Sequence, residues 1–186
     1  HHLFPTTTYH YNSGGDPKDI PSLHYDDLKA FYESHYHPSN AVFMTFGNIP
    51  VGEMHSFFED RALARFDKSS ERIGVESEKR YTNPVRAVES YPETEADGRT
   101  HIVLAWLLQK NTDLMMLLKC HLLSDVLLET SASPLRKALE DSDLGSAISP
   151  LTGLEESNHE MSFMCGLEGS DRDNEAAVEE LILETL

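Results

Sequence analysis

The amino-acid sequence predicts an α+β fold in which helices are layered on small sheets. Apolar residues recur at helical spacing in several segments, and shorter apolar runs bounded by turn residues have the length of strands. The two kinds of segment are mixed along the chain, which is the pattern of α+β proteins. With 39% hydrophobic and 25% charged residues among 186, the composition is that of a globular protein long enough to bury a core.

The first third of the chain is expected to contain an irregular arm, two helices and a strand. Residues 3–23 are rich in Pro, Thr, Tyr, Gly and Asp and keep no regular period, which predicts the arm. The spacing of apolar residues predicts one helix over 25–36, with His24 at its cap position, and another over 51–66. The apolar run at 40–48 lies between them and is closed by turn residues, so we expect a mostly buried strand there.

A polar, charged stretch separates the two halves of the chain. Residues 67–98 contain Pro84, Pro92 and many charged side chains, and they predict a linker with one extended segment around Tyr91. The predicted divisions of the chain are therefore 1–66, 67–98 and 99–186.

The second half is expected to mix strands and helices. The predicted strands cover 100–108 and 161–167, and the predicted helices include a long one over 113–128 and another over 175–186. Asn111 or Thr112 is expected to cap the long helix. A short helix between them should have Ser133 as its cap and Pro134 at its first position. Gly145 is expected just beyond the end of the short helix. The long helix is apolar on most sides, so it should be central in its domain or pack against a partner surface.

Charge and hydropathy argue against two classes of partner. The 32 acidic and 15 basic residues give a net charge of -17, which opposes approach to nucleic acid or to an anionic membrane face. No apolar run reaches the roughly 18 residues that a membrane-spanning helix needs. The two cysteines, Cys120 and Cys165, are too few for a disulfide framework and fit a reducing compartment. We therefore expect a soluble protein that binds neither nucleic acid nor a membrane.

The ten histidines include no recognisable metal-binding motif. Apart from the adjacent His1-His2 at the start of the sequence, His35 and His37 are the only close pair, and we recognise no metal-ligand motif around them. Imidazoles at the end of a helix also suit the helix dipole, which gives this pair a simple structural interpretation. Neither H-E-x-x-H nor H-x-x-E-H occurs, so both helix motifs of zinc proteases are missing from the sequence.

Motifs for other catalytic chemistry are missing as well. The sequence has no G-x-S-x-G, no phosphate-binding loop and no motif that marks an activated thiol. Cys120 is expected in a core, with His121 on the polar side of the same helix. The acidic cluster formed by Glu155, Glu156, His159 and Glu160 is expected to be a solvated loop. The sequence thus predicts no catalytic residue and no metal ligand within this chain.

Short motifs on both sides of the predicted linker form a distinctive series. The first group is Leu3-Phe4-Pro5, Tyr9, Ser13-Gly14-Gly15-Asp16-Pro17, Ile20-Pro21, His37-Pro38-Ser39-Asn40-Ala41 and Gly47-Asn48. The second group is Ser133-Pro134-Leu135, Ala138-Leu139, Ser142-x-Leu144-Gly145 and Gly166-Leu167-x-Gly169. In this order and spacing they resemble the pitrilysin/insulinase-type zinc metallopeptidases, or inverzincins, and in particular the presequence protease and falcilysin branch.

The resemblance covers nearly the whole chain and implies two partial units of the pitrilysin-type metallohydrolase fold. Residues 1–66 would be the C-terminal part of the first unit, 67–98 a linker, and 99–186 the N-terminal part of a second, non-catalytic unit. The chain begins at His1-His2 in a loop-like stretch and ends on a helix, so we expect an internal fragment or a tagged piece of a longer parent.

The resemblance also implies the chemistry of that parent, which is zinc-assisted hydrolysis of unfolded peptides in a closed chamber. Its zinc ligands would lie before residue 1 and its other chamber groups beyond residue 186, so this fragment should bind no zinc and be inactive alone. The turn Ser13, Gly14, Gly15 and Asp16 is the candidate for lying near the substrate groove. The branch further implies an organelle lumen, mitochondrial or plastid.

Two alternatives to the peptidase fragment remain open on the sequence. One is a catalytically silent homologue that binds peptides or partner chains. The other is an independent enzyme whose metal site involves His35, His37 or His101. In either case, exposed apolar surface on the long helix favours self-association.

Overall fold

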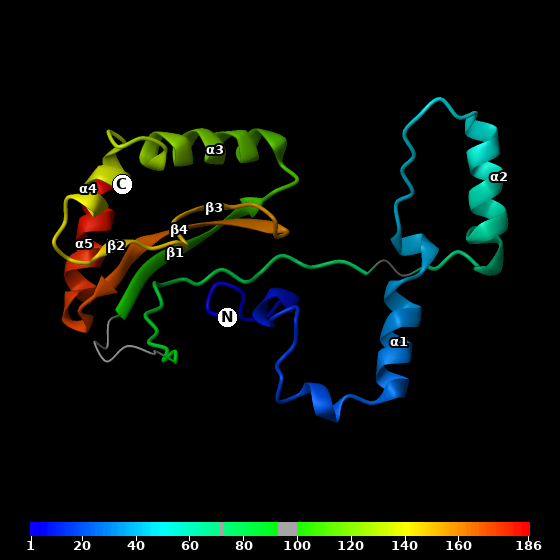
Figure 1. Ribbon diagram of the computed structural model, residues 1–186, viewed down its shortest axis with the longest axis horizontal. Helices are drawn as coiled ribbons and strands as arrows, with labels where there is room; N and C mark the ends of the chain where they lie inside the picture. Colours follow the sequence, from blue (N-terminus) through cyan, green and yellow to red (C-terminus); the bar gives the residue numbers. More distant parts are fainter. Residues whose placement is uncertain (71–72, 93–99) are drawn as a thin grey trace. The chain divides into compact units, whose positions relative to one another are not determined.

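The computed structural model describes residues 1–70, 73–92 and 100–186, which group into two compact units (Figure 1). The first unit joins residues 1–11 to residues 76–186, and the second comprises residues 12–75. The predicted divisions 1–66, 67–98 and 99–186 say which domain of a longer parent each part of the chain belongs to, and they stay a prediction. Within the predicted linker, residues 71–72 and 93–98 lie outside the described residues.

The first unit is built on an antiparallel sheet of four strands, β1 (Thr100–Lys110), β2 (Ala147–Ile148), β3 (Gly153–Glu155) and β4 (Glu160–Ser170). Strand β4 is central: β1 pairs with one of its edges, and β2 and β3 pair with the other. The sequence predicts β1 and β4 correctly, although both run a few residues longer than expected. It misses β2 and β3 because strands of two and three residues are too short to show a period.

A glycine allows β1 and β4 to approach closely. Gly166 pairs with Val103 in the ladder, and a Cβ atom at Gly166 would lie 2.8 Å from the Cα of Val103 and would overlap the carbonyl oxygen of Ile102. Any side chain at this position would therefore force the two strands apart. The sequence pattern Gly166-x-x-Gly169 thus has a structural explanation at its first glycine.

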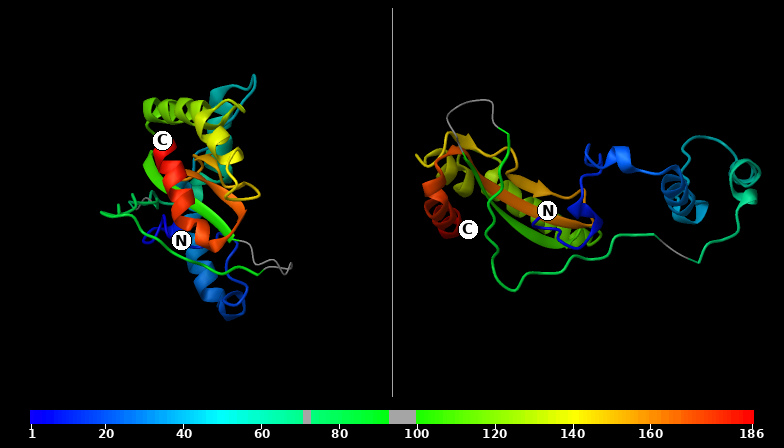
Figure 2. Two further views of the ribbon diagram at one scale, coloured as in Figure 1. Left: turned by 90° about the vertical axis from the view of Figure 1, so that its left-hand side faces the viewer. Right: turned by 90° about the horizontal axis from the view of Figure 1, so that it is seen from below.

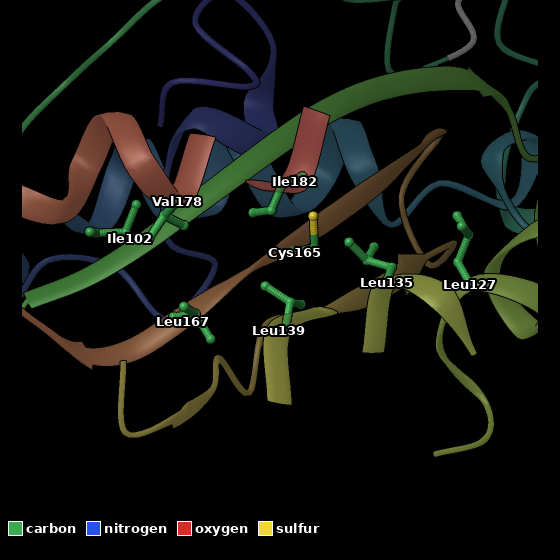
Figure 3. Close-up of a cluster of buried hydrophobic side chains, with 8 residues drawn as sticks. All are labelled: Ile102, Leu127, Leu135, Leu139, Cys165, Leu167, Val178 and Ile182. Carbon is green, nitrogen blue, oxygen red and sulfur yellow. The ribbon is translucent and has the colours of Figure 1, made fainter. Parts of the chain in front are cut away.

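Three helices pack on one face of this sheet: α3 (Leu114–Leu128), α4 (Pro134–Glu140) and α5 (Glu175–Thr185), as Figures 1 and 2 show. Alternate side chains of a strand point to the same face of the sheet, so every second side chain of β1 and β4 faces the helices. The resulting core contains Ile102, Leu127, Leu135, Leu139, Cys165, Leu167, Val178 and Ile182, every one of them buried (Figure 3). Each of the three helices contributes to it. This arrangement confirms the α+β prediction.

The ends of two helices differ from the expectation. Asp113, and not Asn111 or Thr112, caps α3, because its carboxylate accepts hydrogen bonds from the backbone N–H groups of the next turn, Met115 and Met116, both at 3.1 Å. Gly145 does not end α4, whose last residue is Glu140. A Cβ atom at Gly145 would lie 2.8 Å from the Cβ of Leu167, so this glycine serves close packing of the loop on β4.

The second unit contains the helices α1 (Tyr25–His35) and α2 (Val51–Arg61). Helix α1 begins after His24, as predicted. Helix α2 is shorter than the predicted span 51–66, because the chain leaves the α conformation at Ala62 and forms a single 3-10 turn, Leu63–Arg65. Neither helix has a buried residue.

The prediction of a buried strand over 40–48 is wrong. Residues 38–40 form the 3-10 turn Pro38–Asn40, Ala41 after it is extended, and residues 41–46 belong to no sheet. Their side chains are exposed rather than buried. The physical reason is that a strand acquires its hydrogen bonds and its burial only from a neighbouring strand, and none of the described residues supplies one.

Candidate functional site

The Ser13-to-Asp16 turn lies in the second unit and is fully exposed. The Asn12 carbonyl oxygen accepts a hydrogen bond from the N–H of Gly15 at 2.9 Å, and its side-chain oxygen accepts one from the N–H of Gly14 at 2.9 Å. Gly15 has a φ of +79°, a backbone conformation that side chains with a Cβ rarely adopt. The glycine is therefore needed for the shape of the turn.

The carboxylate of Asp16 is engaged within the same turn. One carboxylate oxygen accepts a hydrogen bond from the backbone N–H of Lys18 at 2.9 Å. The backbone carbonyl oxygen of Asp16 accepts one from the N–H of Asp19, also at 2.9 Å. These bonds form a local Asx-type turn that leads into the 3-10 turn Ile20–Ser22. The turn presents its backbone and the Ser13 side chain to solvent.

The histidine pair His35 and His37 does not converge on a common point. Nδ1 of His35 lies 3.0 Å from the carbonyl oxygen of Phe31, and its ring stacks on the Phe31 ring with 3.8 Å between centroids. Nδ1 of His37 accepts a hydrogen bond from the N–H of Ser39 at 3.1 Å, and its ring meets the edge of Phe66. Each imidazole thus stabilises its own stretch of backbone.

His101 lies on β1 in the other unit. Its Nδ1 is 4.0 Å from a carboxylate oxygen of Glu168, and its ring contacts that of Tyr91. Within 1–70, 73–92 and 100–186, no three His, Cys, Asp or Glu side chains are grouped so that they could hold a metal ion. The zinc that the resemblance implies belongs to the longer parent, with ligands expected before residue 1, and the described residues offer no group of side chains that fits it.

The most perturbed carboxylate of the described residues is Glu78, which the sequence offers no reason to single out. Its side chain is 4% exposed and accepts hydrogen bonds from the N–H groups of Thr6 at 3.0 Å, Thr7 at 2.9 Å and Lys79 at 2.8 Å, and from the Thr6 hydroxyl. Burial opposes ionisation, but these hydrogen bonds outweigh it and lower the pKa of Glu78 from 4.5 to about 2. Glu78 ties the N-terminal residues to the segment that precedes β1.

A second buried carboxylate, Glu160, continues this network at the start of β4. It accepts a hydrogen bond from the N–H of Glu78 at 2.6 Å and forms an ion pair with Arg80, whose guanidinium lies 2.7 Å from the other oxygen. Arg80 also donates to the carbonyl oxygen of Leu108. The hydroxyl of Tyr9 accepts a hydrogen bond from the N–H of His159 at 2.8 Å, so the N-terminal residues contact this corner of the sheet directly.

The solvated acidic loop predicted at 155–160 is therefore wrong for Glu160, which is 3% exposed. Glu156 is partly exposed and pairs with His121 of α3, with 2.6 Å between Nε2 and the carboxylate oxygen. Sequence reasoning missed the Glu78–Glu160 network because its members lie about 80 residues apart, as the Arg80–Glu160 bond illustrates. Perturbed carboxylates can mark active sites, but the bonds described here go to the chain's own backbone, to the Thr6 hydroxyl and to Arg80, which indicates a structural role.

Neither cysteine is placed for nucleophilic chemistry. Cys165 is completely buried between β4 and the helices, and this burial raises the pKa of its thiol to about 12. Cys120 is half-buried on α3 and unbridged. Cys120 does not belong to the buried core cluster, contrary to the sequence expectation.

Helix α3 exposes a group of large apolar side chains. Its exposed residues are Leu114, Met115, Leu118, Leu122, Leu123 and Val126, each more than half exposed. Leu127 is the one buried residue of α3, so the helix is not central in the first unit, and the alternative expectation, that it packs against a partner surface, stays a prediction. Among the described residues, no helix has both the length and the apolar character required to cross a bilayer.

Comparisons with known proteins identify relatives along almost the whole chain. The family model described as the peptidase M16 inactive domain matches residues 22–186. The chain is 37% identical over 189 aligned residues to presequence protease 1, chloroplastic/mitochondrial, of Arabidopsis thaliana, and 35% identical over 191 residues to the mitochondrial presequence protease of Xenopus laevis. The alignment with the mitochondrial presequence protease of Yarrowia lipolytica is 35% identical over 182 residues.

These relatives are much longer than the chain. The first two alignments cover 99% of the chain but only 17% and 18% of the relatives. The third covers 94% of the chain and 18% of its relative. The chain therefore corresponds to less than a fifth of a presequence protease.

Proposed function

Because this chain belongs to the peptidase M16 family, in which it matches the inactive domain, we propose that it is an internal, non-catalytic segment of a zinc metalloendopeptidase. The parent would degrade unfolded peptides in a closed chamber. The observation that supports this role is the match of 165 consecutive positions, residues 22–186, to a domain described as inactive, together with 35–37% identity to presequence proteases over 99% of the chain.

The contribution of this segment would be structural. Its sheet and helices would form part of the chamber wall, and the Ser13-to-Asp16 turn would lie near the substrate groove. The turn is exposed and presents Gly14 and Gly15 without side chains, so a peptide backbone could approach it closely. The segment from 1 to 66 would complete one unit of the parent, and the segment from 99 to 186 would begin the next, with 67–98 as the linker.

Peptide cleavage by the full-length parent, with and without a metal chelator, tests this proposal. We expect chelation to abolish cleavage and zinc to restore it, while residues 1–186 alone cleave nothing. Gly15→Val in the parent tests the turn, with Gly52→Val as a control: a Cβ at Gly52 meets open space, and its φ is not positive. We expect Gly15→Val to raise KM for peptides; unchanged stability and cleavage would remove the turn from the groove.

A catalytically silent homologue is the second candidate, because an inactive-domain match is also what a peptide-binding or partner-binding subunit would give. The region encoded before residue 1 decides between the two. If it lacks H-x-x-E-H, and the full-length protein binds peptides without cleaving them, the silent subunit is correct. The names of the relatives support an organelle, mitochondrion or chloroplast, as the location to examine.

A further inference from the structure

Glu78 is a buried carboxylate whose hydrogen bonds come mostly from the N-terminal residues. Its oxygens accept hydrogen bonds from the N–H groups of Thr6, Thr7 and Lys79 and from the Thr6 hydroxyl. Three of these four bonds come from residues 6 and 7, and the side chain is only 4% exposed. A carboxylate has about four lone-pair positions, so the N-terminal residues fill most of its bonding capacity. Without them, the buried charge would keep a single hydrogen bond from the described residues, which is a costly state.

The sheet of the first unit holds the backbone of Glu78 in place. The N–H of Glu78 donates to a carboxylate oxygen of Glu160 at 2.6 Å, and Glu160 is 3% exposed at the start of β4. The other oxygen of Glu160 lies 2.7 Å from the guanidinium of Arg80, which also donates to the carbonyl oxygen of Leu108 on β1. The acceptor that binds the N-terminal residues is therefore fixed on the two long strands of the sheet.

Two aromatic residues add further contacts to the N-terminal residues. The hydroxyl of Tyr9 accepts a hydrogen bond from the N–H of His159 at 2.8 Å, across 150 positions of the sequence. Phe4 is 7% exposed and meets the Tyr9 ring edge to face, with 5.2 Å between the ring centroids. A buried aromatic ring removes a large apolar area from water. Residues 4–9 thus contact the first unit as a bound peptide would, through a buried ring, backbone N–H groups on a carboxylate and a tyrosine hydroxyl.

These contacts cross the predicted boundary between two domains of the parent. Residues 1–66 are assigned to one parental domain and 99–186 to the next, yet residues 1–11 group with residues 76–186 in one compact unit. We infer that residues 1–11 are a strap by which the first parental domain is held on the second, and that Glu78 is the buried anchor of this strap. The assignment to parental domains rests on the proposed function, whereas the contacts of the strap do not.

Cutting the folded chain at two points tests whether the strap holds without its covalent connection. One site for a sequence-specific protease is inserted between Ser13 and Gly14, in an exposed turn, and a second after Gly74, where a Cβ atom would meet open space. We expect the N-terminal peptide to stay with residues 75–186 in gel filtration after both cuts. Fluorescence of Trp106 on β1 shows whether the sheet is still folded.

Three variants of the doubly cut chain locate the anchor. Glu78→Ala should raise the dissociation constant of the peptide at least about 10-fold, because two N–H groups lose a charged acceptor. Glu76→Ala is the matched control, since it removes the same charge from an exposed side chain two positions away and should leave the dissociation constant unchanged. Phe4→Ala keeps the test valid if Glu78→Ala does not fold, because Phe4 lies on the strap and outside the buried core cluster. It should also weaken binding at least about 10-fold.

Hydrogen exchange of the amides of Thr6 and Thr7 carries the test to the full-length parent. We expect both amides to be protected in the 186-residue chain and in the parent, because they exchange only when the strap detaches. Glu78→Ala should remove this protection in both samples, and Glu76→Ala should preserve it. Peptide cleavage by the same parent sample reports separately on the proposed function, so either idea can fail alone.

Three results would overturn the inference. A peptide that leaves once the chain is cut, or a sheet that unfolds, would mean that the contacts of residues 1–11 do not suffice to hold them. Equal weakening by Glu78→Ala and Glu76→Ala would mean that Glu78 is not the anchor. Free exchange of the Thr6 and Thr7 amides in the parent, with protection in the shorter chain, would mean that the strap does not join the parental domains.

Discussion

Removing the carboxylate of Glu78 should destabilise the first unit by roughly 3 kcal/mol at neutral pH. In Glu78→Ala the N–H groups of Thr6 and Thr7 lose their acceptor, and an unsatisfied, partly buried donor costs about 1–3 kcal/mol. Part of this loss is offset because a charge no longer has to be buried. The N-terminal residues should then detach from the segment that precedes β1.

The pH dependence of this effect follows from the lowered pKa of Glu78. A carboxyl group whose pKa is lower in the folded than in the unfolded chain stabilises the fold above the unfolded value and loses that effect as the pH falls through the folded value. For Glu78 these values are 4.5 and about 2. The difference in unfolding free energy between the wild-type chain and Glu78→Ala should therefore be constant above about pH 5.5 and shrink between pH 4.5 and pH 2.

Urea unfolding followed by tryptophan fluorescence measures this difference. Trp106 is the single tryptophan, and it lies on β1 with its ring 6.2 Å from that of Phe163, so it reports on the first unit. Glu89→Ala is the control, because the Glu89 side chain is 79% exposed and, among the residues that the structure describes, pairs with His2 alone; the change should be within about 0.5 kcal/mol. A loss below about 1 kcal/mol for Glu78→Ala, or a difference that persists at low pH, would refute this reasoning.

Three further predictions concern the core of the first unit. Gly166→Ala should force β1 and β4 apart and lower the unfolding free energy by more than about 2 kcal/mol, measured by urea unfolding; an unchanged midpoint would show that the strands adjust freely. Leu135→Ala should cost about 2–5 kcal/mol because the side chain is 0% exposed, whereas Leu118→Ala, 53% exposed, should cost far less; equal losses would contradict the packing described here. The Cys165 thiol should resist a thiol reagent at pH 8 in the folded chain and react after unfolding, as mass spectrometry can follow.

The helices and the two long strands could be predicted from the sequence because their signals are local. Helix α4 illustrates this, since Ser133 and Pro134 occupy the first positions that capping chemistry favours. The structure adds that the Ser133 hydroxyl does not cap the helix but accepts a hydrogen bond from the N–H of Thr130 at 3.1 Å. The residue types at 133 and 134 therefore locate the start of the helix correctly, but they do not identify the hydrogen bond that the Ser133 side chain makes.

Features that depend on distant residues could not be predicted in this way. Nothing near Glu78 in the sequence distinguishes it from the other acidic residues of a charged stretch, because the donors that bury it come from residues 6 and 7. Glu160 was assigned to a solvated loop for the same reason. In contrast, the absence of zinc-protease motifs is a property of the sequence itself, and the family resemblance inferred from short motifs is confirmed by relatives that are 31–37% identical over 99% of the chain.

The central position of β4 has a consequence for how the chain acquires its sheet during synthesis. Strands β1, β2 and β3 pair only with β4, and β4 is the last of the four to leave the ribosome. Until residue 160 has emerged, β1 has no partner for its 11 residues, and the apolar residues of α3 have no sheet to cover. Assembly of the sheet should then occur in one late step with long loops to close, so β1 and the apolar residues of α3 stay exposed in the nascent chain until β4 is available.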